Sequence, residues 1–222
     1  MEPRMATRDE FLQRYWSYYL LLEKDFLETE RYLAIDEQLN SSAYSNEYIK
    51  QYQAICSEID VIAKSFCKEL NASFNGKTID KYCKIIIDNN SDFSSHVIKV
   101  KNRSIEITPW QNWNYTMEIK PNGKLNLVVA NPDWWTKYNK IKHCRTTIND
   151  ESGLPYYKLA NQKNVLNALA ALFQLEMYYH KLLHQNHFSD DIDIPEPESS
   201  LFEIKDWNSQ WSICTNIHMG SF

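Results

Sequence analysis

The chain has 222 residues, and its formal net charge at pH 7 is −5. This length is sufficient for one well-buried core, and a hydrophobic share of 43% excludes a disordered or fibrous chain. The weakly acidic balance argues against non-specific wrapping of nucleic acid, because that affinity comes from many contacts between phosphates and Lys or Arg. The five cysteines are odd in number and form no C-x-x-C pair, so neither a disulfide framework nor a cysteine zinc site is predicted.

The sequence also carries no sign of a membrane segment or a nucleotide site. Residues 1–10 are polar and of mixed charge, and the chain has no apolar run of about 18 residues. It has no P-loop, Rossmann or G-x-S-x-G fingerprint. We therefore expect a cytoplasmic protein that does not contact the membrane and needs no cofactor.

The first half of the chain has the apolar spacing of amphipathic helices. Between residues 7 and 36, apolar side chains recur at steps of three and four, which predicts a first helix. A break at Asn40-Ser41-Ser42 precedes a second helix, whose apolar face runs from Tyr48 to Leu70. Thr78 is expected to cap a third, shorter helix that extends to Ile86.

A change of period predicts a small antiparallel β insert at about 96–130. Residues 96–108 indicate two short strands around Asn102-Arg103. Residues 115–130 indicate a hairpin, because alternating apolar residues flank a turn at Pro121-Asn122-Gly123. A segment of about 35 residues cannot build a large core alone, so we interpret it as an insert in a mainly α-helical domain.

Helical spacing returns after Asn131-Pro132-Asp133, where Asn can cap and Pro suits the first helical position. The last helix is predicted at about 159–187, and its apolar stretch at 165–179 suits a central helix that is covered on several sides. Residues 1–187 are thus expected to form one domain. Residues 188–222 are interpreted as an acidic linker and an aromatic C-terminal tail that packs on the domain. The tail residues expected to dock are Leu201, Phe202, Trp207 and Trp211.

The helix that follows Pro132 carries the residues best suited to chemistry. Asn139 and His143 are four residues apart and share a helical face, with Lys142 beside them. An imidazole next to a fixed cation can do acid–base work on a phosphodiester, because it titrates near neutral pH and the cation offsets charge on the phosphorane. The basic residues of this helix, which could hold phosphates, are Lys137, Lys140, Lys142 and Arg145.

Several segments together resemble a group of bacterial HEPN-like proteins that are related to the HEPN ribonucleases. They are the string YN-x-x-KH-x-R at residues 138–145, the preceding Trp134-Trp135 pair, the helix that begins at Asn161, and Ser57-Glu58-Ile59-Asp60. The resemblance covers roughly residues 10–187. It implies a HEPN-like helical bundle that forms a homodimer, uses no metal and acts on or senses RNA in bacterial defence or stress response.

The HEPN ribonuclease motif consists of an Arg, a polar residue and, a few residues later, a His. Asn139 and His143 match the polar residue and the His, whereas Tyr138 occupies the position of the Arg. The resemblance therefore implies a degenerate site in which His143 is the acid–base residue, Asn139 orients it, and Lys142 and Arg145 are the catalytic cations. The substrate-binding residues predicted on the same helix are Tyr138, Lys140 and Lys137.

A structural interpretation of this helix remains open beside the catalytic one. Its apolar residues, Tyr138 among them, would be core, and His143 would hydrogen-bond a buried carbonyl or a carboxylate such as Glu58. Glu58 could equally pair with Lys142 or Arg145 across the helices. The matching function is a non-catalytic module that dimerises through its aromatic helices and presents the β insert or the C-terminal tail to a protein partner.

A second set of candidates lies on the last helix. Glu176, His180, His184 and His187 fall on one face at steps of four, four and three, and imidazoles four residues apart can bind zinc. H-E-x-x-H is absent, however, and the helix is close to its C-terminal end, where His residues favourably meet the helix dipole. No bound metal is therefore expected.

Overall fold

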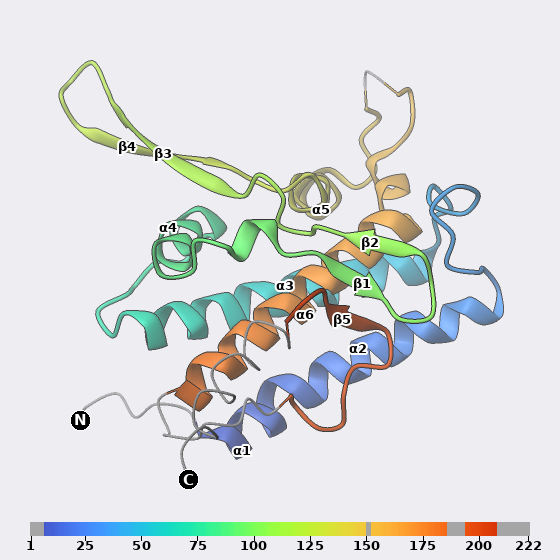
Figure 1. The fold of residues 1–222 in the computed structure, drawn as a ribbon. Helices are drawn as coiled ribbons and strands as arrows, with labels where there is room; N and C mark the ends of the chain where they lie inside the picture. Colours follow the sequence, from blue (N-terminus) through green and yellow to red (C-terminus); the bar gives the residue numbers. More distant parts are fainter. Residues whose placement is uncertain (1–6, 150–151, 186–193, 208–222) are drawn as a thin grey trace, which may run out of the picture.

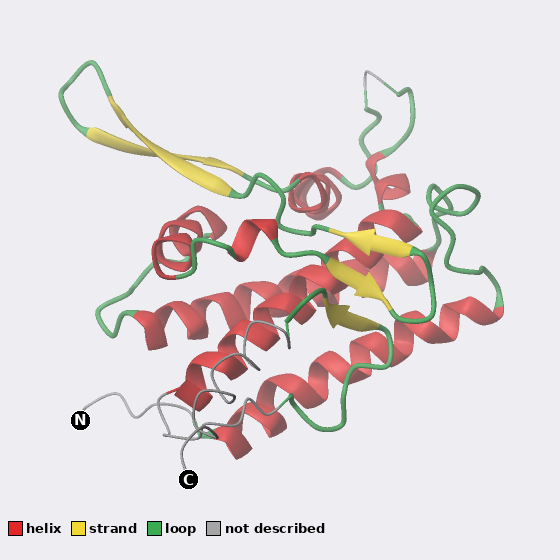
Figure 2. Ribbon diagram, in the orientation of Figure 1, coloured by secondary structure: helices red, strands yellow, loops and turns green. Residues whose placement is uncertain are grey.

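Helices make up most of the regular structure in the computed structural model, which describes residues 7–149, 152–185 and 194–207. In chain order the helices are α1 (Arg8–Phe11), α2 (Ser17–Glu28), α3 (Asn46–Leu70), α4 (Ile79–Asn89), α5 (Asp133–Cys144) and α6 (Gln162–Gln185). The strands are β1 (Ile98–Val100), β2 (Ile105–Ile107), β3 (Asn114–Ile119), β4 (Leu125–Ala130) and β5 (Phe202–Ile204). The prediction of a mainly α-helical chain with a small antiparallel β element is confirmed (Figure 2). None of the described helices is long and apolar enough to cross a membrane.

The first predicted helix is continuous through α1 and α2, which are joined by a π-helical turn, η1 (Leu12–Trp16). It starts at a capping box, because the Thr7 hydroxyl accepts from the Glu10 amide at 3.2 Å and the Glu10 carboxylate accepts from the Thr7 amide at 3.0 Å. The helix ends in a 3₁₀ turn, η2 (Thr29–Arg31), and therefore stops before the predicted limit at residue 36.

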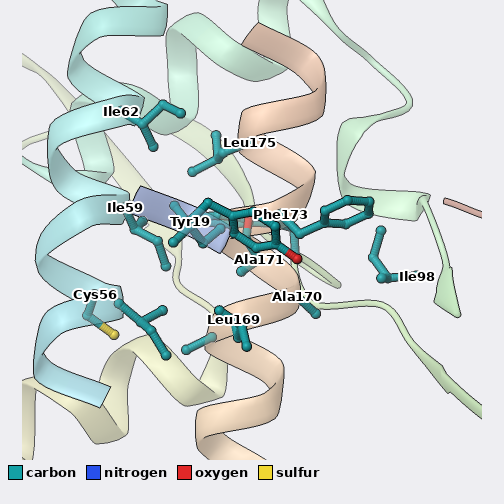
Figure 3. Close-up of a cluster of buried hydrophobic side chains, with 14 of the residues drawn as sticks. Tyr19, Cys56, Ile59, Ile62, Ile98, Leu169, Ala170, Ala171, Phe173 and Leu175 are labelled. Carbon is teal, nitrogen blue, oxygen red and sulfur yellow. The ribbon is translucent and has the colours of Figure 1, made fainter. Parts of the chain in front are cut away.

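The core lies between α3 and α6, which run side by side through the centre of the molecule (Figure 1). Ile59 and Ile62 of α3 point toward α6, where Leu169 and Leu175 meet them (Figure 3). All four side chains are fully buried. Almost every residue at 165–179 is buried, so the apolar composition of this stretch reflects a central helix with neighbours on all sides.

The β element is divided between two sheets. The hairpin of β3 and β4 forms a sheet by itself and extends away from the helices (Figure 1). The strands β1 and β2 form a three-stranded antiparallel sheet with β5, in the order β2-β1-β5. Ile98 of β1 therefore pairs with Ile107 on one side and with Ile204 of the tail on the other. The hairpin that the Pro-Asn-Gly turn indicated is present, whereas the pairing with the tail was not predicted.

The tail from residue 194 to 207 packs on the helices through polar as well as apolar contacts. The buried Glu23 carboxylate of α2 accepts hydrogen bonds from the hydroxyl groups of Tyr19, Ser199 and Ser200 and from the Ser200 amide. Phe202 and Trp207 are buried as well, so these two rings are not available to a protein partner. The described residues do not include His187, the first part of the predicted linker up to residue 193, or Trp211 of the predicted tail.

Candidate functional site

The helix α5 lies against α3 and α6 and is fastened by its aromatic side chains (Figure 1). The Trp134 indole N–H donates to the Pro109 carbonyl at 2.6 Å, and the Tyr52 hydroxyl of α3 donates to the Trp134 carbonyl. The helix begins one residue later than expected, because Pro132 occupies the cap position instead of the first helical position. The residues of α5 that are buried against the core are Trp134, Trp135, Tyr138 and Ile141.

The predicted catalytic residues lie at the C-terminal end of α5. His143, Lys142 and Arg145 are exposed at the C-terminal end of the helix, and Asn139 is half-buried one turn earlier. Within the part of the chain that the structure describes, His143 forms no hydrogen bond or ion pair, and neither does Glu58. The interpretation in which His143 is buried against Glu58 is therefore wrong, and so is an ion pair of Glu58 with Lys142 or Arg145.

Tyr138 differs from the other predicted site residues because its side chain is only 6% exposed. Its ring packs against the rings of Tyr52 and Trp135, with centroid distances of 6.0 and 5.2 Å. Burial raises the pKa of Tyr138 to about 12, so its hydroxyl stays protonated near neutral pH. The Lys142 ammonium lies 5.7 Å from the ring centroid. These contacts argue against direct binding of a substrate by Tyr138 and instead make its ring a support for Lys142.

Of the remaining predicted binding residues, Lys140 is exposed and Lys137 is engaged within its own helix. Lys137 forms an ion pair with Asp133, four residues before it, at 2.5 Å. The Lys140 ammonium lies 5.5 Å from the centroid of the Tyr156 ring. Lys140 therefore remains part of the exposed basic surface, whereas Lys137 is partly neutralised.

Residues that the sequence did not single out join this surface from η4 (Tyr156–Leu159). The amide of Tyr157 donates to the Arg145 carbonyl at 2.9 Å and thereby holds η4 against the end of α5. Lys158 extends the cationic surface, and its ammonium lies 5.1 Å from the centroid of the Tyr44 ring. We call Lys140, Lys142, His143, Arg145, Tyr156 and Lys158 the α5 basic surface. No periodic pattern could have located η4, because only the fold brings it to α5.

The residues of α6 weighed as candidate metal ligands do not form a metal site among the described residues. Glu176 and His180 are buried, the side chain of His184 and all of His187 lie outside the described part, and no described group of three or more His, Cys, Asp or Glu could hold a metal ion. Neither carboxyl oxygen of Glu176 has a hydrogen-bond partner among the described residues. Burial, with a smaller contribution from the Glu58 carboxylate, raises the Glu176 pKa well above its usual value, so its carboxyl group is expected to be neutral.

The comparisons with known proteins leave the function to be argued from these residues. No protein-family model matches the chain. No curated protein and no solved structure matches it either.

Proposed function

We propose that this chain is a HEPN-like protein of bacterial defence or stress response that binds RNA and cleaves it without a metal, at a degenerate site on α5. The observation that carries the proposal is the exposure of His143 among cations. Its imidazole is free of described partners, and Lys142 and Arg145 lie on the same end of the helix. A histidine that merely stabilised the core would be buried and hydrogen-bonded.

The chemistry required is the transfer of a phosphodiester within RNA. His143 would take the proton from a ribose 2′-hydroxyl, the 2′-oxygen would attack the adjacent phosphorus, and the bond to the 5′-oxygen would break. The products are a 2′,3′-cyclic phosphate and a 5′-hydroxyl end, which takes up a proton. Lys142 and Arg145 would offset the negative charge that accumulates on the phosphorane oxygens. These two cations would replace the Arg of the HEPN motif, since Tyr138 is buried in its position.

The rest of the α5 basic surface supports binding of single-stranded RNA. Lys140 and Lys158 provide positive charge, and each lies beside an aromatic ring, that of Tyr156 for Lys140 and that of Tyr44 for Lys158. A combination of cations and aromatic rings is typical of sites that bind single strands, because the cations follow the phosphates and the rings can stack on bases.

The direct test is incubation of the full chain with single-stranded RNA at low salt, with and without EDTA. We expect cleavage in both samples and products that end in a 2′,3′-cyclic phosphate. Cleavage that disappears with EDTA would contradict a metal-independent site. Absence of both cleavage and binding would contradict RNA as the substrate.

A second candidate function is a non-catalytic interaction module, and the exposed β3–β4 hairpin favours it. Its strands carry apolar side chains that the described domain does not cover, including Ile119 at 74% exposure. The aromatic residues of α5 do not provide such a surface, because Trp134 and Trp135 are buried. Binding of a protein through the hairpin together with inertness toward RNA would favour this second function.

A further inference from the structure

The β3–β4 hairpin presents an apolar face that is packed against the domain at its base and exposed toward its turn. The register of the strands places alternate side chains of 115–119 and of 125–129 on the same face, and all six are apolar or aromatic. Toward the turn this face is open, since Met117, Ile119 and Leu125 are 46%, 74% and 67% exposed. A two-stranded hairpin is at best marginally stable in water, and a continuous apolar face of this kind usually marks an interaction site.

The base of the hairpin is fixed to the domain by α4. The Tyr115 hydroxyl donates to the Asp88 carboxylate, and the Lys84 ammonium lies 4.7 Å from the centroid of the Tyr115 ring. Lys84 and Asp88 also form an ion pair at 2.5 Å. The direction of the hairpin is therefore set at its base, while its far end extends from the helices (Figure 1).

The far end of the hairpin is positively charged. The Lys120 amide donates to the Lys124 carbonyl at 2.9 Å, so the two lysines face each other across a turn in which Gly123 has a φ of 75°. Like charges directly across a hairpin repel. Neither lysine forms an ion pair with a described residue, and Glu118 is the only acid between residues 118 and 125. We call residues 119–125 the tip.

A groove of about 580 Å³ lies between the C-terminal end of α2 and the N-terminal end of α3, and we call it the α2–α3 groove. Its lining combines carboxylates with apolar and aromatic side chains, namely Asp25, Glu28, Glu47, Tyr32, Leu33 and Tyr44. Lys50 is paired with Glu47 at 2.9 Å and also attracts the Asp25 carboxylate, whereas Glu28 forms no ion pair with a described residue. Tyr32 is 89% exposed.

We propose that the tip of one copy of this chain occupies the α2–α3 groove of a second copy. The two surfaces are complementary in charge, because the two lysines of the tip would meet a groove whose lining has three carboxylates, Asp25, Glu28 and Glu47, beside Lys50. They are also complementary in polarity, because Ile119 and Leu125 would cover the exposed Tyr32 and the partly buried Leu33. A single contact between tip and groove would thus use both the exposed apolar face of the hairpin and the carboxylates of the groove.

The positions of the two surfaces allow both to be used at once. The hairpin lies at the upper left in Figure 1, and the ends of α2 and α3 that form the groove lie at the right. In a two-fold symmetric dimer, each tip would occupy the partner's groove, so the contact would be made twice. Two reciprocal contacts bury twice the area of one, which matters because a stable interface needs roughly 800 Å² per partner.

The test is a charge exchange, read by light scattering after size exclusion over a range of protein concentrations. The tip variant is Lys120→Glu/Lys124→Glu, and the groove variant is Asp25→Lys/Glu28→Lys. Each variant is expected to dimerise with a dissociation constant at least tenfold higher than that of wild type. An equimolar mixture of the two variants is expected to restore association, because each reversed tip then meets a reversed groove.

The control is Lys68→Glu/Lys77→Glu, which reverses two exposed lysines outside both surfaces and should leave the dissociation constant within twofold of wild type. A monomeric wild-type chain at every concentration would overturn the proposal. So would association that survives both reversals, or a mixture that stays monomeric. A tip variant that loses affinity for RNA while its dimer is unchanged would assign the tip to nucleic acid instead.

Discussion

At the scale of single residues, exposure separates the roles of neighbours on one helix. Tyr138 and Ile141 are buried, whereas Lys142 and His143, one and two positions beyond Ile141, are exposed. For His143 the difference follows from helical geometry, since at about 100° per residue its side chain points away from both Tyr138 and Ile141. Lys142 lies beside Tyr138 and is exposed because the helix ends there. The same string of residues can therefore fasten α5 to the core and present an imidazole and an ammonium to solvent.

The number of cations on α5 should determine how strongly RNA affinity depends on salt. Lys140→Gln/Arg145→Gln removes two phosphate contacts, so the slope of log affinity against log salt for single-stranded RNA should fall in magnitude by about 1.4. Fluorescence anisotropy with labelled RNA between low and moderate salt measures this slope. Lys68→Gln/Lys77→Gln is the matched control, and an equal change of slope in that control would disprove a localised site.

Glu58 provides a pH-dependent contribution to stability. Burial raises its pKa from 4.5 to about 6, so the folded chain binds this proton more tightly than the unfolded chain does. The stabilising contribution is therefore present below pH 4.5 and is lost as the pH rises through about 6. Glu58→Gln removes this dependence on pH. After allowance for the partial exposure of Glu58, the free energy of unfolding of the variant minus that of wild type should be about 1 kcal/mol larger at pH 7.5 than at pH 4.

Urea unfolding of both proteins at the two pH values measures this difference. Glu37→Gln is the control for the chemical change itself, since Glu37 is exposed and lies outside both proposed surfaces, and it should change the free energy of unfolding by no more than about 0.5 kcal/mol at either pH. If Glu58→Gln differs from wild type by the same free energy of unfolding at both pH values, Glu58 has the same pKa in the folded and the unfolded chain, which would contradict the prediction.

At the scale of elements, the position of the tail strand β5 depends on the carboxyl group of Glu23, which is far away in the sequence. Glu23 accepts four hydrogen bonds, three of them from Ser199 and Ser200 in the tail. Glu23→Gln replaces one acceptor oxygen by an amide donor, so we expect a loss of about 2 kcal/mol in the free energy of unfolding. Urea unfolding measures the loss, and unchanged stability would mean that the tail is held by its apolar contacts alone.

The elements that the sequence predicted best are those with a local signal. The long periodic stretch at 165–179 and the Pro121-Asn122-Gly123 turn both indicated the correct structure, because helical period and turn chemistry act between near neighbours. The pairing of β1 with β5 could not be predicted, since about 100 residues separate the strands and three residues carry too little pattern. For the same reason, the pattern located His143 but not Lys158.

At the scale of the whole molecule, the hairpin and the α2–α3 groove give the domain two ends that differ in charge. If each tip binds the partner's groove, association stabilises the folded state by mass action. The melting temperature of the wild-type chain should therefore rise with protein concentration, whereas that of Lys120→Glu/Lys124→Glu should not. Differential scanning fluorimetry over a hundredfold range of concentration makes this comparison, and parallel curves for the two proteins would argue against the pairing.

The proposed function requires that the α5 basic surface is a site of RNA cleavage. The most direct measurement is the rate of cleavage of single-stranded RNA in EDTA by wild type, His143→Ala and Cys144→Ala, an exposed neighbour on the same turn. Loss of the acid–base group should slow cleavage by at least about 100-fold without changing the urea unfolding curve, and Cys144→Ala should stay within twofold of wild type. Cleavage by His143→Ala at the wild-type rate would contradict the proposed site.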